Sequence, residues 1–139
     1  MKPTRLFLAG VAPIAVIVLQ HATLPQAVAR DDGQWNSQPA AVRQWFQSLM
    51  QPDNPHMSCC GEADAYWADS YEVDADRYVA IITDERPDEP LGRRHRQLGE
   101  RIVVPNSKIK WDEGNPTGHG IIFIGIGGQI YCYIPPGGV

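Results

Sequence analysis

Residues 121–134 read IIFIGIGGQIYCYI. Two runs rich in β-branched and aromatic residues, 121–125 and 129–134, lie on either side of a glycine-containing connection at 126–128. β-Branched and aromatic residues favour strands, and a short glycine-containing connection favours a hairpin turn. The stretch therefore predicts an antiparallel hairpin that carries Cys132 in its second strand.

Strand patterns continue toward the N-terminus from this hairpin. Residues 65–73 and 77–83 are rich in strand-forming side chains and are joined by a polar turn at 74–76. Residues 101–105 form a further short apolar run, and 106–120 consist mostly of turn-forming residues. The spacing predicts a small antiparallel sheet made from consecutive segments.

One helix precedes the strands. The apolar residues of this segment recur at the spacing of a single helix face: Val42, Trp45, Phe46, Leu49 and Met50. Ser37 is suited to cap this helix, Pro39 to lie in its first turn, and Pro52 to end it. Residues 51–57 contain a second proline, Pro55, so we expect them to be irregular. The stripe of Trp45 and Phe46 is typical of core packing.

The helix and strands together predict an α+β domain, with one N-terminal amphipathic helix packed on a small antiparallel, partly barrel-like sheet. An alternative arrangement is a mostly β barrel in which the helix caps one end. The chain has no internal repeat or low-complexity run. We expect a signal peptide at 1–29, a linker at 30–38 and a single small domain at 39–139.

The first residues have the pattern of an export signal. Lys2 and Arg5 give a positive start, 6–19 is apolar, and 27–29 reads AVA, a small-residue cleavage site. The apolar run is shorter than the roughly 20 residues that a membrane-spanning helix needs. We therefore expect cleavage before Arg30, a periplasmic or secreted product, and no membrane association after cleavage.

The charge of the chain bears on its partners. The formal net charge is −4, and removal of Lys2 and Arg5 with the signal, which holds no acidic residue, lowers it to −6. Nucleic acids and anionic lipids attract basic proteins. This balance argues against either as the main partner.

Three cysteines, Cys59, Cys60 and Cys132, would fold in an oxidising compartment. Adjacent cysteines bond to each other only through a strained small ring, so we expect a disulfide from Cys132 to either Cys59 or Cys60. The third thiol would be buried, reactive or bonded to another molecule.

A metal or thiol-redox site is the alternative reading of the same region. His56, Cys59 and Cys60 lie within five positions, and Cys132 or His119 would complete a soft site suited to copper(I) or zinc. Adjacent residues seldom point at one ion, however, and no Cys-x-x-Cys pair is present. The spacing therefore favours a disulfide over a cofactor.

A basic group, Arg93, Arg94 and Arg96, lies in the charged stretch 84–100 and is suited to anion binding. Acidic residues flank it on both sides: Asp88, Glu89 and Glu100. Mixed charges of this kind are typical of an exposed loop or a short polar helix, and we expect a neutralised, exposed loop in preference to an anion site.

An ordered set of motifs resembles a group of small exported proteobacterial proteins that have no assigned activity. The motifs are Ser58-Cys59-Cys60 with Asp64 shortly after, Val103-Val104-Pro105, Asn115-Pro116-Thr117-Gly118, and Cys132-Tyr133-Ile134-Pro135-Pro136. The similarity covers roughly 42–137. It implies export and a disulfide-containing fold. It also implies a second cysteine pair at the positions that Ala65 and Phe123 occupy here, so the second bridge would be absent as a unit.

No complete catalytic signature is present in the sequence. We therefore expect a non-enzymatic binding or accessory module whose partner is another envelope protein or a small molecule. A soft-metal-binding or thiol-redox protein that uses Cys59 and Cys60 is the alternative function.

Overall fold

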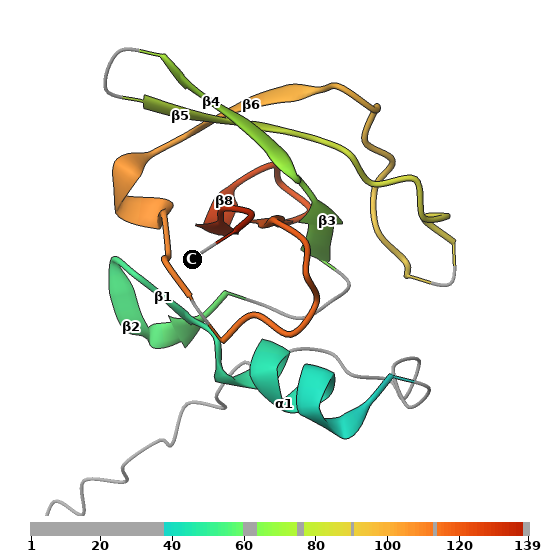
Figure 1. The fold of residues 1–139 in the computed structure, drawn as a ribbon, viewed down its shortest axis with the longest axis vertical. Helices are drawn as coiled ribbons and strands as arrows, with labels where there is room; N and C mark the ends of the chain where they lie inside the picture. Colours follow the sequence, from blue (N-terminus) through green and yellow to red (C-terminus); the bar gives the residue numbers. More distant parts are fainter. Residues whose placement is uncertain (1–37, 60–63, 75–76, 90, 113, 138–139) are drawn as a thin grey trace, which may run out of the picture.

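The computed structural model describes residues 38–59, 64–74, 77–89, 91–112 and 114–137 (Figure 1). The elements follow one another as α1 (Ala40–Ser48), β1 (Met50–Gln51), β2 (Asn54–Ser58), β3 (Ala65–Trp67), β4 (Ser70–Asp74), β5 (Arg77–Ile81), β6 (Arg101–Val104), the 3-10 helix η2 (Asn106–Lys108), β7 (Ile121–Ile124) and β8 (Ile130–Ile134). A helix combined with antiparallel strands makes this part of the chain α+β.

The strands form three small antiparallel sheets, with the orders β1-β2, β3-β7-β8 and β4-β5-β6. None of these three sheets of the described residues closes into a barrel, so the α+β class expected from the sequence holds, whereas the single sheet and the capped barrel of the alternative arrangement do not. The expected strand at 65–73 breaks at Ala68 and Asp69, where the backbone leaves β3 and enters β4. At this break the Ala68 N–H still bonds to the Gly120 carbonyl, 2.8 Å away and directly before β7. The chain therefore stays with the β3-β7-β8 sheet up to Ala68 and joins the β4-β5-β6 sheet only from Ser70.

The hairpin at the end of the chain is confirmed. β7 and β8 pair antiparallel, with Phe123 opposite Cys132 and Ile122 opposite Tyr133. Gly128, at φ 84°, supplies the left-handed residue of the turn, and the Gly125 N–H bonds to the Gln129 carbonyl across it at 2.9 Å.

β7 separates the core into two layers because its side chains alternate. Ile121 and Phe123 pack toward α1 in one cluster of buried residues, completed by Phe46, Leu49, Cys59, Ala65, Cys132 and Ile134. Ile122 and Ile124 pack toward the β4-β5-β6 sheet in the other, completed by Tyr66, Ala68, Ala80, Ile82, Val104 and Tyr133. Figure 1 shows the resulting order, with α1 at the bottom, β3 and β8 in the middle and β4, β5 and β6 at the top.

The helix is shorter than expected. Pro39 is its N-cap, Phe46 is its buried residue, and its backbone leaves the helical conformation at Leu49. Met50 and Gln51 instead pair with β2, so the prediction of an irregular segment at 51–57 is also wrong. The prolines are tolerated because only two residue pairs form in this short hairpin, and Pro55 lies in neither of them.

Several expectations lie outside the described residues. These are the signal peptide at 1–29, most of the linker, the Ser37 cap, Cys60 and the centre of the 74–76 turn. Within the described ranges, no helix has the length and apolar character needed to cross a membrane.

Candidate functional site

The hairpin of β4 and β5 carries an exposed group of apolar side chains. We call Tyr71, Val73, Tyr78 and Trp111 the aromatic face. The exposed fractions are 42% for Tyr71, 58% for Val73 and 61% for Trp111, and Tyr78 is half-buried. The rings form a chain, because Tyr71 stacks on Tyr78 with centroids 5.6 Å apart and Tyr78 meets the Trp111 ring edge-on at 6.0 Å.

The register explains why these side chains lie together. Val73 is opposite Tyr78, and Tyr71 is opposite Ala80, so the side chains of these two pairs point to the same side of the sheet. Trp111 comes from a loop and joins them through its contact with Tyr78. Ala80 on that side is fully buried against β7 and β8. The aromatic face is therefore the continuation of a core-facing surface beyond the point where the core ends.

The buried Tyr133 of β8 links the aromatic face to the core. Burial, together with repulsion from the nearby ionisable groups of Tyr71, Asp69 and Tyr78, raises the pKa of the Tyr133 phenol above its ordinary value. The hydroxyl therefore stays protonated, and it donates to the Ala68 carbonyl at 3.3 Å. This bond holds β8 against the start of β4.

A second cluster surrounds Trp67 at the junction of β3 and β4. The Trp67 ring lies between His119, stacked with centroids 3.8 Å apart, and the Arg86 guanidinium, 4.3 Å from the ring centre. The Nδ1 atom of His119 lies 3.0 Å from Asp69 Oδ2. Asp69 also accepts hydrogen bonds from the Gly120 N–H and the Thr83 hydroxyl.

A histidine hydrogen-bonded to a carboxylate, as in this cluster, is also the arrangement of the general base and its orienting group in many hydrolases. A nucleophile is also needed there. Among the described residues, no hydroxyl or thiol is hydrogen-bonded to the imidazole of His119. The bonds of Asp69 to Gly120 and Thr83 join three separate segments of the chain, so the cluster stabilises the packing of these segments against one another.

The charged stretch 84–100 differs from the sequence expectation. The Arg93 and Asp84 side chains are 2% and 1% exposed and lie 2.6 Å apart, so this part of the loop is buried. Arg93 also bonds to Asp88 at 2.9 Å, and Arg86 bonds to Asp84 at 2.7 Å. The remaining described residues of 84–100 are exposed or half-buried, so the prediction of an exposed, neutralised loop fails only at Asp84 and Arg93. Arg93 finds protein acceptors in place of water, including the Ala65 carbonyl at 2.7 Å.

The same contacts set the charge state of Asp84. Burial alone raises a carboxyl pKa, but hydrogen bonds from Arg86, Arg93 and the backbone N–H groups of Trp67 and Arg86 outweigh it. The pKa of Asp84 therefore lies well below its ordinary value. Asp84 is a fixed anion that balances the cations around it.

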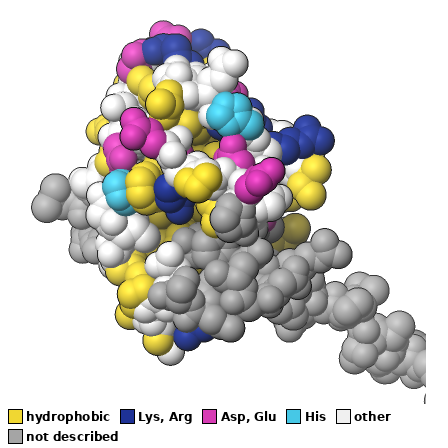
Figure 2. Space-filling view, turned by 90° about the vertical axis from the view of Figure 1, so that its right-hand side faces the viewer, with side chains coloured by type: hydrophobic (Ala, Val, Ile, Leu, Met, Phe, Trp, Pro, Cys, Tyr) yellow, Lys and Arg dark blue, Asp and Glu magenta, His cyan; other side chains and the backbone are white. Residues whose placement is uncertain are grey.

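An open recess of about 610 Å³ borders this network and extends over residues 95–98. The cations that line it already have acidic partners: Arg93 has Asp84 and Asp88, and Arg96 has Glu100 at 2.8 Å. On the side of the molecule seen in Figure 2, acidic, basic and histidine side chains are interspersed and not grouped by sign. The arrangement argues against an anion site.

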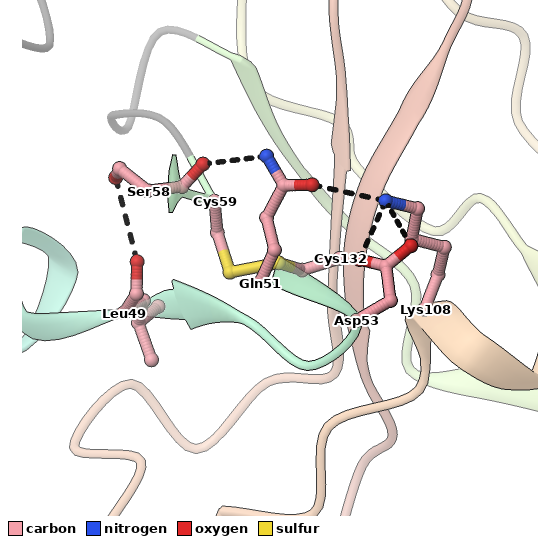
Figure 3. Close-up of a disulfide and its surroundings, with 7 residues drawn as sticks. All are labelled: Leu49, Gln51, Asp53, Ser58, Cys59, Lys108 and Cys132. Atoms are coloured by element: carbon pink, nitrogen blue, oxygen red, sulfur yellow. Dashed lines mark hydrogen bonds and ion pairs between the residues drawn. A yellow bond between two sulfur atoms is a disulfide. The ribbon is translucent and has the colours of Figure 1, made fainter. Parts of the chain in front are cut away.

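Cys59 and Cys132 form a disulfide, with Cα atoms 5.5 Å apart, so the structure selects Cys59 from the two adjacent cysteines. Both are fully buried. Figure 3 shows the polar layer beside the bond, in which the Lys108 ammonium donates to Gln51 at 2.9 Å and pairs with Asp53 at 2.7 Å. Gln51 in turn donates to the Ser58 carbonyl at 2.9 Å, directly before Cys59.

The described residues do not assemble the soft-metal site that the sequence offered as the alternative to a disulfide. The sulfurs of Cys59 and Cys132 are bonded to each other, His56 is exposed on β2, and His119 pairs with Asp69. Within the described ranges, no group of three or more His, Cys, Asp or Glu side chains is placed to hold a metal. Cys60 lies outside those ranges.

No family model matches this chain, and the comparisons with curated proteins and with solved structures found no match. Ala65 and Phe123, the positions at which the resemblance implies a second bridge, are direct register partners in β3 and β7.

Sequence reasoning missed the aromatic face. Its signal is the alternation of Tyr71 and Val73 with Glu72 and Asp74, which predicts a strand with one apolar side. That pattern normally marks the buried side of a strand. The sequence alone does not reveal that β4 extends beyond the core.

Proposed function

We propose that this protein is an exported, non-enzymatic binding or accessory module that recognises another envelope protein through its aromatic face. The observation that carries the proposal is the contiguous array of Tyr71, Tyr78 and Trp111 with Val73, exposed beside a well-packed core. Exposed apolar patches are uncommon on small monomers and mark interaction sites. Tyrosine and tryptophan are the side chains most enriched where binding energy is concentrated.

The export pattern and the disulfide support an envelope location. The buried Cys59–Cys132 bond persists in an oxidising compartment, and residues 1–29 have the composition of a cleaved signal. An envelope protein is the partner class that such a location offers. The residues of the aromatic face do not line the recess beside 84–100, and small ligands bind in concave pockets, so a protein fits this face better than a small molecule does.

The proposal is tested with a photo-crosslinking amino acid placed at single positions in the exported full chain. Val73 is the test position, and Leu98 is the matched control, since both are 58% exposed and apolar but Leu98 lies on the charged loop. We expect ultraviolet light to produce a discrete crosslinked protein from position 73 and not from position 98. Mass spectrometry identifies the captured protein.

The identified partner is then purified and its affinity for the wild-type chain and for Trp111→Ala is measured. We expect the substitution to weaken binding at least tenfold, as for an interface aromatic at an energetic centre. The same crosslinks from positions 73 and 98, or an unchanged affinity for Trp111→Ala, would refute the proposal.

A further inference from the structure

The short hairpin of β1 and β2 carries both methionines of the described part of the chain. Met50 is 40% exposed, Met57 is 53% exposed, and His56 beside Met57 is exposed as well. Methionine is one of the residue types most often buried, so two exposed methionines on one small element are unusual. In Figure 1 this hairpin lies at the left edge of the molecule, opposite the loop 84–100.

The register of the hairpin explains this exposure. Its pairs are Met50 with Ser58 and Gln51 with Asn54. Residues 55–57 therefore form a bulge on β2 that has no partner on β1, and a bulge of this kind re-aims its side chains. Gln51 is buried, so the adjacent Met50 of the same strand points to the opposite, outer side.

Two thioethers and one imidazole lie close enough together to share an ion. Every residue of β1 has its Cα within 8 Å of every residue of β2, so Met50 is within this distance of both His56 and Met57. The methionine side chain has three rotatable bonds, which let each sulfur turn toward a common point. The bulge itself is held in place, because the His56 backbone N–H donates to Asn54 Oδ1 at 3.3 Å and Pro55 restricts the backbone.

The imidazole of His56 is available as a ligand. Among the described residues, no side chain bonds to this ring, whereas the rings of His95 and His119 are each paired with a carboxylate. The acidic residue of the hairpin, Asp53, is already paired with Lys108 at 2.7 Å. The hairpin therefore offers soft, neutral donors and no free carboxylate.

We propose that Met50, His56 and Met57 bind one copper(I) ion through two thioether sulfurs and one imidazole nitrogen. Soft thioether ligands select copper(I), whereas zinc sites use cysteine, histidine and carboxylate ligands. The sequence pattern groups His56 with cysteines, but the disulfide removes Cys59 and Cys132 from that set, and the methionines take their place. The site goes beyond the proposed function, because it lies on the β1-β2 sheet and not on the aromatic face.

The probe is copper(I) itself, supplied without oxygen as a coloured complex with a copper(I) chelator. Loss of the colour reports transfer of the metal to the protein. The measurement uses the exported, oxidised chain and its Cys60→Ser variant, which removes the remaining thiol as a ligand. We expect both proteins to take up one copper(I) per chain with the same affinity, and zinc not to bind at the same concentration.

Conservative variants locate the ligands. Met50→Leu, Met57→Leu and His56→Gln each remove one donor and keep a side chain of similar size at an exposed position. We expect each to weaken copper(I) binding at least tenfold. His95→Gln is the matched control, because His95 is also exposed but lies on the loop 84–100 and pairs with a carboxylate. It should leave the affinity unchanged.

NMR of carbon-13 in the methionine methyl groups gives a direct readout of the ligands. Apart from Met1, the sequence contains only Met50 and Met57, so each signal reports one proposed ligand. We expect both signals to shift on addition of one equivalent of copper(I) and neither to shift with zinc. Intact mass without and with thiol alkylation checks that every variant keeps the disulfide.

Several results overturn the inference. These are no transfer of copper(I) from the chelator, binding that is lost in Cys60→Ser, binding that persists when Met50 and Met57 are both replaced by leucine, or methyl signals that stay in place when copper(I) binds. The crosslink from position 73 decides separately whether the proposed function stands, because it concerns the aromatic face and needs no metal.

Discussion

Arg93 Nη1 lies 2.6 Å from Asp84 Oδ2, and the two side chains are 2% and 1% exposed. The same guanidinium donates to the Ala65 carbonyl of β3 and its Cζ lies 4.6 Å from the centre of the Tyr66 ring. Arg93 thus holds the loop 84–100 against β3 of the β3-β7-β8 sheet.

Replacing Arg93 with leucine should destabilise the fold strongly. The substitution leaves Asp84 buried with one fewer cation, and breaking a buried pair in this way costs about 3–5 kcal/mol. Arg77→Leu is the control, since its pair with Asp74 is 58% and 65% exposed and such pairs contribute at most about 1 kcal/mol. Urea unfolding followed by circular dichroism measures both. Similar losses for the two variants would contradict a buried role for Arg93.

Acid should remove part of this stabilisation. The folded pKa of Asp84 lies below its unfolded value of about 3.9, so the contribution is complete above that pH and is lost as the pH falls toward the folded pKa. We expect the difference in unfolding free energy between the wild-type chain and Asp84→Asn to be constant from pH 7 to 5 and to shrink below about pH 4. Urea titrations at pH 7, 5, 4, 3 and 2 test this. A difference that stays constant to pH 2 would show that Asp84 titrates normally.

The features that were predictable from sequence are local ones. The β7 and β8 hairpin follows from adjacent strand runs and a glycine turn, and the bridge to Cys132 follows from the strain of a ring between adjacent cysteines. The split into separate sheets was not predictable, because it depends on where Ala68 meets Gly120, 52 positions further along the chain. The burial of Arg93 was hidden for the same reason, since its acceptors come from distant segments and charge alone indicates exposure.

Loss of the disulfide should lower the free energy of unfolding strongly, and only two of the three cysteines should contribute to stability. Cys59 and Cys132 are separated by 73 positions, and closing a loop of that length stabilises by about 4 kcal/mol in the chain-entropy model. We expect Cys132→Ser and Cys59→Ser to destabilise the exported protein equally and Cys60→Ser to change its stability little. Thermal unfolding under oxidising conditions and thiol counting by intact mass measure the outcome. An unchanged melting temperature for Cys132→Ser would rule out the bridge.

The packing of α1 on the disulfide layer gives the last prediction. Phe46 is 7% exposed, its ring meets Phe123 of β7 edge-on at 6.0 Å, and it shares a buried cluster with both bridged cysteines. Truncating such a side chain to alanine removes its burial and leaves a cavity, at a cost of about 3–5 kcal/mol. The neighbouring Gln47 is exposed on the same helix, so Gln47→Ala should change stability by no more than about 0.5 kcal/mol.

Denaturant unfolding of both helix variants, with near-ultraviolet circular dichroism to follow the aromatic environment, separates the possible roles of α1. If Phe46→Ala lowers the free energy of unfolding strongly and Gln47→Ala does not, the helix is part of the same cooperative unit as β7 and β8. The cavity then opens in the layer that holds the disulfide. Equal, small losses for the two variants would mean that α1 unfolds independently of the sheets.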